Sequence, residues 1–145
     1  MKDRFKVISA VYLILQKDGC ILLSRRVNTG YCDGMYGLPS GHVEEGESLI
    51  SAMVREAKEE IGLDVRREDL QYAYCVSRLA ADGHRIDHIF TLDTWEGEPI
   101  NQEPEKCDDL AWFAIDSLPD TIIPYVRRII ESIAKGERYG EEGWE

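Results

Sequence analysis

The chain has 145 residues and a mass of 16.6 kDa, which is the size of one domain. Its 17 basic and 28 acidic side chains give a formal net charge of −11 and a pI near 4.7. Binding to duplex nucleic acid is disfavoured, because neutralising the phosphates needs a basic surface. Hydrophobic residues make up 43% of the chain, which excludes a disordered or fibrous protein.

The first strand is expected over residues 7–16. This apolar run follows three basic residues but has no small-residue cleavage site after it, so a buried strand is favoured over a signal peptide. The turn Lys17-Asp18-Gly19 predicts a hairpin with a second strand over residues 20–24. No apolar run reaches the ~20 residues of a membrane helix, so no membrane partner is expected.

A loop rich in Gly, Asn and Pro follows over residues 26–41, with a short strand expected at 35–38. Ser48 can cap a helix that runs to about Ile61, and Gly62 is expected to end it. The helix carries an apolar stripe, which should face the core.

Two further strands are expected over residues 71–79 and 85–95, joined around a second Asp-Gly turn, and another over 110–115. A last helix is expected over residues 122–134, with an apolar face formed by Tyr125, Ile129, Ile130 and Ile133. The elements predict the α+β class or a three-layer sandwich, in a single domain of residues 1–135. Residues 136–145 are polar and are expected to form a frayed tail, to which Trp144 could dock.

The four cysteines show no C-x-x-C pattern and no zinc-site spacing. Reduced thiols in a cytoplasmic protein are therefore expected.

Residues 41–63 follow the pattern G-x5-E-x7-R-E-U-x-E-E-x-G-U, where U is aliphatic. The pattern resembles the Nudix box of the Nudix hydrolases at every defined position. The resemblance implies the Nudix fold, an α/β/α sandwich with a mixed β-sheet, the box helix and a C-terminal helix, and it points to a compact MutT-like member. One departure is Ser40 before Gly41, where many members have two glycines.

Three acids of this pattern, Glu56, Glu59 and Glu60, lie three and four residues apart and so share one helix face. Like charges at this spacing repel, and an acidic helix face is ordinarily a solvated surface. Here the opposite face is apolar and a glutamate-rich loop precedes the helix, so the acids can converge. Clustered carboxylate oxygens suit Mg²⁺, with Mn²⁺ as an alternative.

The resemblance also implies individual roles in the metal site. Glu56 and Glu60 are implied to be direct metal ligands, and Glu59 a ligand either directly or through water. Glu59 and Glu60 are also expected among the catalytic residues. The carbonyl of Gly41 is implied to be a backbone ligand.

Arg55 is implied to brace the site by pairing with an acid, for which Glu47 is the expected partner. A two-point contact between them would fix the loop to the helix. A direct contact of Glu47 with the metal is also expected from the resemblance.

Two further sets of candidate site residues lie outside the box. The segment of residues 95–99 resembles MutT, and counting on from it gives Glu103 as a metal ligand or general base, with Glu105 as the alternative. Arg25 and Arg26 end a strand and resemble an arginine pair that holds nucleotide phosphates, with Arg26 favoured.

The implied activity is Mg²⁺-dependent hydrolysis of a nucleoside diphosphate linked to another moiety, a small-molecule substrate. Foremost is the conversion of a nucleoside triphosphate to a monophosphate and pyrophosphate. One alternative is another diphosphate conjugate such as a nucleotide sugar, and a second is a domain that only binds or senses a nucleotide. Arg78 and Leu79 occupy the positions at which a proline would indicate ADP-ribose hydrolysis. The oligomeric state is left open, with a homodimer as one alternative.

Overall fold

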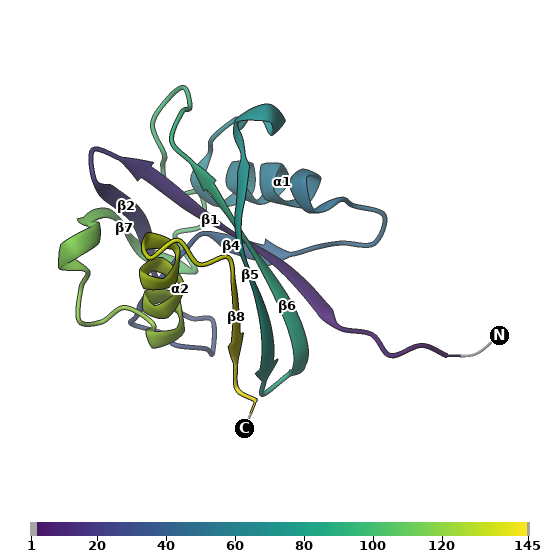
Figure 1. The fold of residues 1–145 in the computed structure, drawn as a ribbon. Coiled ribbons are helices and arrows are strands. Elements are labelled where there is room, and N and C mark those ends of the chain that lie inside the picture. The colour runs from purple at the N-terminus through teal and green to yellow at the C-terminus, as the bar shows by residue number, and fades with distance from the viewer. Residues whose placement is uncertain (1–2, 145) are drawn as a thin grey trace.

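The computed structural model describes residues 3–144 as a mixed sheet of eight strands between two α-helices (Figure 1). The strand order is β3-β2-β1-β6-β5-β8, with β4 paired to β1 and β7 paired to β2. The elements in chain order are β1 (Ile8–Lys17), β2 (Cys20–Arg26), β3 (Tyr36–Gly37), β4 (Ser40–His42), α1 (Leu49–Ile61), the 3₁₀ turn Arg67–Asp69, β5 (Gln71–Ala80), β6 (Gly83–Leu92), β7 (Cys107–Ala114), the 3₁₀ turn Ile115–Ser117, α2 (Pro124–Ala134) and β8 (Tyr139–Glu142).

Strand β1 serves the core on both faces of the sheet. Leu13 and Leu15 pack in the cluster under α1, whereas Ile14 between them packs in the cluster under α2. Successive side chains of a strand point to opposite faces, so one apolar run can supply two cores. The predicted hairpin is present, with Lys17 opposite Cys20 and positive φ angles at Asp18 and Gly19.

Helix α1 begins and ends where the sequence predicts. The hydroxyl of Ser48 caps it by accepting a hydrogen bond from the backbone N–H of Ser51 (3.1 Å), and Gly62 ends it with a φ of 70°. Its buried face includes Met53 and Ile61, which pack in the core cluster with β1.

Helix α2 covers the opposite face of the sheet (Figure 1). Proline at its first position suits a helix start, since its missing N–H has no helical partner in any case. Tyr125, Val126, Ile129 and Ile130 are buried. The predicted α/β/α sandwich of the α+β class is therefore confirmed. Within residues 3–144, neither helix is both long and apolar enough to cross a membrane.

The expectation of a frayed tail is wrong for residues 139–142, which form β8 and pair in parallel with β5. Strand β8 is held by backbone pairing with β5 rather than by a buried apolar face, so its sequence shows no alternation of apolar and polar residues. Gly140 lies so close to the hydroxyl of Tyr74 that a Cβ would overlap it. Trp144 docks as predicted, donating from Nε1 to the carbonyl of Ser77 (2.9 Å). The division of the chain at residue 135 stays a prediction.

The loop that follows β6 is bound to the C-terminal end of α1. The N–H of Ile100 donates to the carbonyl of Ile61 (2.9 Å), and that of Gln102 donates to the carbonyl of Glu60 (3.1 Å). Carbonyls at this end of a helix have no partner within the helix, so the loop satisfies them. Gly62 permits the approach, because a Cβ there would lie 2.9 Å from Cγ1 of Ile100 and 3.0 Å from Nε2 of Gln102.

Gly62→Ala is therefore expected to cost more stability than an ordinary glycine replacement at positive φ. The left-handed conformation alone should cost roughly 1–2 kcal/mol, and the contact with Ile100 and Gln102 should add to it. Gly136→Ala is the matched control, since Gly136 has a φ of 83° and no atom within 4 Å of a Cβ. The free energy of unfolding is measured with urea, and equal losses in the two variants would contradict the role of Gly62 in loop packing.

Candidate active site

A cleft of about 790 Å³ lies between α1, β4, the end of β2 and the β5–β6 hairpin. Four glutamates line it, Glu56, Glu59 and Glu60 from α1 and Glu103 from the loop after β6. The cleft therefore brings together acids that are more than forty residues apart in the sequence. A smaller cavity of about 290 Å³ between α2 and β8 is lined by none of them.

Strand β4, which the sequence did not predict, lies directly against two of these acids. The backbone N–H of Ser40 donates to the carboxylate of Glu60 (3.0 Å). Gly41 is so close to the carboxyl group of Glu56 that any Cβ would overlap it. The glycine is therefore needed at this position for a reason of space, and β4 sets where both carboxylates lie.

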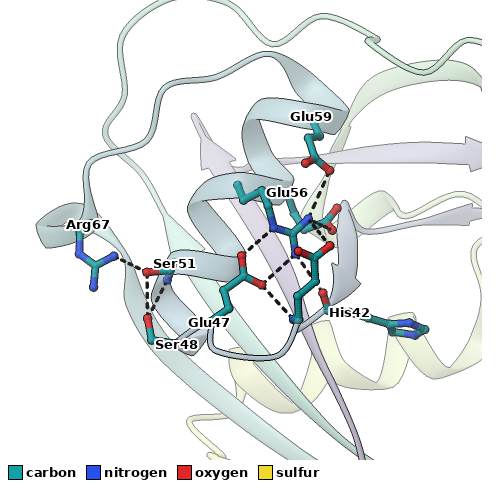
Figure 2. Close-up of polar contacts among 9 residues, drawn as sticks. His42, Glu47, Ser48, Ser51, Glu56, Glu59 and Arg67 are labelled. Carbon is teal, nitrogen blue, oxygen red and sulfur yellow. Dashed lines mark hydrogen bonds and ion pairs between the residues drawn. The ribbon is translucent and has the colours of Figure 1, made fainter.

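The guanidinium of Arg55 connects the helix to the preceding loop. It makes the predicted two-point contact with Glu47, from Nε (2.7 Å) and from Nη2 (3.0 Å). It also donates to Glu56 (2.8 Å), to Glu59 (3.3 Å) and to the carbonyl of His42 (3.0 Å). Figure 2 shows Glu47, Glu56, Glu59 and the carbonyl of His42 directed toward this one point. Five hydrogen bonds from one cation, four of them to carboxylates, hold three like-charged side chains together.

The carboxylate of Glu47 is committed to this network. The hydrogen bonds from Arg55, together with one from the N–H of Glu44 (3.0 Å), lower the pKa of Glu47 to about 2. The same contact with Glu47 raises the pKa of Arg55 above its already high value. Both groups therefore stay charged at neutral pH, and a direct contact of Glu47 with a metal stays a prediction.

The two consecutive arginines of β2 have different surroundings. Arg26 lines the cleft, where its Nε donates to the carbonyl of Tyr31 (2.7 Å) and its guanidinium lies 5.4 Å from the ring of Tyr31. Arg25 is not among the cleft residues and pairs with Asp108 (2.7 Å). Successive side chains of a strand point to opposite faces, so only Arg26 is brought to the acids.

The loop of residues 101–106 holds Glu103 at the cleft. The N–H of Glu103 donates to the side chain of Asn101 (3.0 Å), and its carbonyl accepts from the N–H groups of Lys106 and Cys107, each at 2.9 Å. Glu105 is exposed and is not among the cleft residues. Of the two alternatives, the structure brings Glu103 to the acids of α1.

Sequence reasoning did not assign to the site several residues that line the cleft, among them Tyr12 on β1, Arg78 on β5 and Arg85 on β6. The Asp-Gly turn predicted the hairpin, and its register places Arg78 opposite Arg85. A pair of like charges directly opposite each other in a hairpin is unfavourable, so it was a signal that could have been read from the sequence.

A family model for the NUDIX domain matches residues 5–133. The chain belongs to the Nudix family.

Relatives and solved structures agree with this membership. The chain is 37% identical to an ADP-ribose pyrophosphatase from Methanocaldococcus jannaschii over 76% of the chain and 63% of the relative. It is 27% identical to the 8-oxo-dGTP diphosphatase of Escherichia coli over 86% of this chain and 96% of the relative. A MutT NUDIX hydrolase from Burkholderia pseudomallei superposes with a TM-score of 0.79 at 29% identity, over 88% of this chain and 98% of that one.

Several other relatives are longer proteins. The NAD-capped RNA hydrolase NudC of Stutzerimonas stutzeri is 32% identical, over 77% of this chain and 37% of the relative. The chain thus spans less than two thirds of this relative and of the archaeal one.

Two carboxyl groups of the Nudix box helix lie in surroundings that disfavour a negative charge. Burial, followed by the charges of Glu56 and Glu103, raises the pKa of Glu60 to about 8, although the N–H of Ser40 acts against this. Burial also raises the pKa of Glu56, against the effect of Arg55. A divalent cation beside these groups would favour their charged forms.

The donor set fits a hard cation by its chemistry, since it consists of carboxylate oxygens and backbone carbonyls. As the side chains stand, no three His, Cys, Asp or Glu residues within residues 3–144 are grouped closely enough to hold a metal ion. Glu59 instead pairs with Arg55, and its side chain is 52% exposed. Binding a cation with the full set would therefore require Glu59 or Glu103 to change its side-chain conformation.

Arg55→Lys is expected to be destabilising, because an ammonium group cannot make the planar two-point contact with Glu47. Its cost should shrink in a Glu47→Gln background, since the contact is already weakened there. Urea unfolding of the two single variants and the double variant measures the coupling. The control is Arg67→Lys. Arg67 contacts Ser51 rather than Glu47, so the stability cost of this substitution should be the same with and without Glu47→Gln. Strict additivity for Arg55 and Glu47 would contradict the pairing.

The raised pKa of Glu60 predicts that the metal-free protein loses stability as pH rises. The neutral carboxyl is favoured by folding, so its contribution is complete below pH 4.5 and is lost as pH rises to about 8. The loss can reach about 1.4 kcal/mol per pH unit. In EDTA, Glu60→Gln should match the wild type near pH 4.5 and melt several degrees higher at pH 8.

Thermal unfolding from pH 4.5 to 8.5 gives this comparison. Mg²⁺ should raise the melting temperature of the wild type at pH 8 more than that of Glu60→Gln. Parallel curves for the two proteins across the whole pH range would show that Glu60 does not ionise in this way.

Proposed function

We propose that this chain hydrolyses the diphosphate bond of a nucleoside diphosphate derivative. The preferred substrate class is a nucleoside triphosphate, converted to a monophosphate and pyrophosphate. The observation that supports the proposal is the meeting of the α1 acids with Glu103 and Arg26 in one cleft. The similarity to the 8-oxo-dGTP diphosphatase of E. coli, which covers 96% of that protein, supports the same class of substrate.

Glu56, Glu60 and the carbonyl of Gly41 would hold Mg²⁺ or Mn²⁺, with Glu59 as a further ligand. The cation would screen the phosphate oxygens and acidify the attacking water. The task of the chain is to keep these acids together despite their mutual repulsion. Arg55 does this as a positioning residue, because it contacts both Glu56 and Glu59.

Glu103 is proposed to accept the proton of the attacking water. Its loop is fixed by Asn101 and by the hydrogen bonds to the end of α1, so the carboxylate is presented to the cleft before substrate binds. A general base must lie within hydrogen-bond reach of the water, and of the two loop acids only Glu103 lines the cleft.

Arg26 is the proposed phosphate contact from β2. A guanidinium binds two phosphate oxygens at once, and here Tyr31 holds it in place through its backbone carbonyl. Lys106 lines the same part of the cleft and adds a second positive charge. Arg25 would not take part, since its partner is Asp108 outside the cleft.

A second candidate substrate is ADP-ribose or a similar diphosphate conjugate. It is favoured by the 37% identity to the archaeal ADP-ribose pyrophosphatase. A domain that binds nucleotides without hydrolysis is disfavoured, because all three acids of the box helix are present and line the cleft.

The test is product analysis with a panel of nucleoside triphosphates, ADP-ribose and nucleotide sugars. Release of pyrophosphate from a triphosphate is expected with Mg²⁺, and EDTA should abolish it. Glu103→Gln should lower kcat by ~10²–10⁴-fold with little change in the substrate Kd.

Glu105→Gln is the matched control in the same loop, and its kcat should stay near that of the wild type. Binding of the panel without turnover would overturn the proposal in favour of a sensor domain. If Glu105→Gln is the damaging change, the assignment of Glu103 is wrong.

A further inference from the structure

Two arginines face each other across the β5–β6 hairpin where it borders the cleft. Arg78 and Arg85 are direct cross-strand partners, and both line the cleft. Their side chains are only 13% and 9% exposed. Like charges directly opposite each other repel, and partial burial strengthens the repulsion. The pair therefore needs negative charge nearby.

The buried negative charge beside them belongs to Asp87, which is 0% exposed. Its Oδ2 accepts from Nε of Arg78 (2.8 Å) and from the hydroxyl of Tyr125 (2.7 Å). Its Oδ1 lies 3.5 Å from Nε of Arg85, and neither of these two atoms has a hydrogen-bond partner among the described residues. Asp87 therefore forms a hydrogen-bonded ion pair with Arg78, but only a longer ion pair without a hydrogen bond with Arg85.

The other contacts of Arg85 do not balance its charge. It pairs with Asp82 (2.9 Å), but that side chain is 55% exposed and its charge is screened by water. Nη2 of Arg85 lies 3.4 Å from Nε2 of His42, which supplies no negative charge. One guanidinium charge is therefore left without a buried counter-charge, which is costly unless an anion completes the site.

The acids and the arginines line one cleft, and both groups contact strand β4. Strand β4 runs from Ser40, whose N–H contacts Glu60, to His42, whose ring contacts Arg85. Two steps along a strand span roughly 7 Å. A polyphosphate chain can therefore reach from the acids to the arginines.

We infer that Arg78 and Arg85 form a phosphate site for a group outside the scissile diphosphate. Guanidinium groups only donate hydrogen bonds, and their forked geometry matches phosphate oxygens. The site rests on the proposed function and sharpens it, because it favours a nucleoside triphosphate, which has a third phosphate, over ADP-ribose, which has none. Asp87 and Tyr125 are positioning residues that fix Arg78.

Binding of inorganic pyrophosphate in EDTA tests the site without any turnover. Without a divalent cation the glutamates of the cleft repel the anion, so the remaining affinity reports the cationic residues. Arg85→Gln leaves both hydrogen bonds to Oδ2 of Asp87 in place, so the variant should fold. We expect it to bind pyrophosphate at least about fivefold more weakly by calorimetry.

Arg128→Gln is the matched control, since it removes an arginine that pairs with Glu142 outside the cleft, and its affinity should equal that of the wild type. The inference is overturned if the wild type does not bind pyrophosphate, if Arg85→Gln binds as tightly as the wild type, or if Arg26→Gln alone abolishes binding. Guanosine, which carries no phosphate, is the second probe. Binding of guanosine that depends on Arg85 would assign the site to a base instead.

A kinetic comparison separates this inference from the proposed function. The ratio of kcat/KM for a triphosphate to that for ADP-ribose should fall at least about tenfold in Arg85→Gln. An equal loss for both substrates would overturn the inference while leaving the hydrolase proposal intact. If no substrate is hydrolysed, the hydrolase proposal fails, and the pyrophosphate measurement still decides on the arginine site.

Discussion

The guanidinium of Arg55 is the contact on which the acidic face of α1 depends. Glu56 and Glu59 repel each other on the same helix face, and the loop before the helix adds Glu47. One planar cation meets all three and also binds the carbonyl of His42 (Figure 2). The loop, β4 and α1 are therefore fixed as one unit, although each element alone would gain little stability from the residues within it.

The charges of the cleft are separated into an acidic part and a basic part. The acidic part, with Glu56 and Glu60 held in surroundings that raise their pKa, is suited to a cation. The basic part, with Arg78 and Arg85, has more positive charge than its buried acid can balance. A protein of net charge −11 repels free polyphosphates at long range. Under the proposed function, a bound cation and these local arginines would let such a chain hold one.

The sequence predicted the features that are encoded locally. The Ser48 cap, the Gly62 stop and the spacing of the box acids depend on neighbours within a few residues, and the structure has the first two as expected. It did not predict β8, because that strand depends on a distant strand becoming its neighbour. The arginine pair was missed although it lies within a predicted hairpin, where the turn sets the register that places Arg78 opposite Arg85. From the sequence, Arg26 was favoured over Arg25, and of the two arginines it is Arg26 that lines the cleft.

The two glycines at the ends of the box show how a site can depend on the absence of a side chain. Gly41 lets a strand lie against the carboxyl group of Glu56, and Gly62 lets the loop of Ile100 and Gln102 lie against the end of α1. The first approach sets the position of an acid of the helix, and the second holds the loop that carries Glu103. The close approach of β4 to the side of α1 and of the loop to its C-terminal end therefore determines how far apart the acids lie. This is why glycine, rather than any small polar residue, is required at both places.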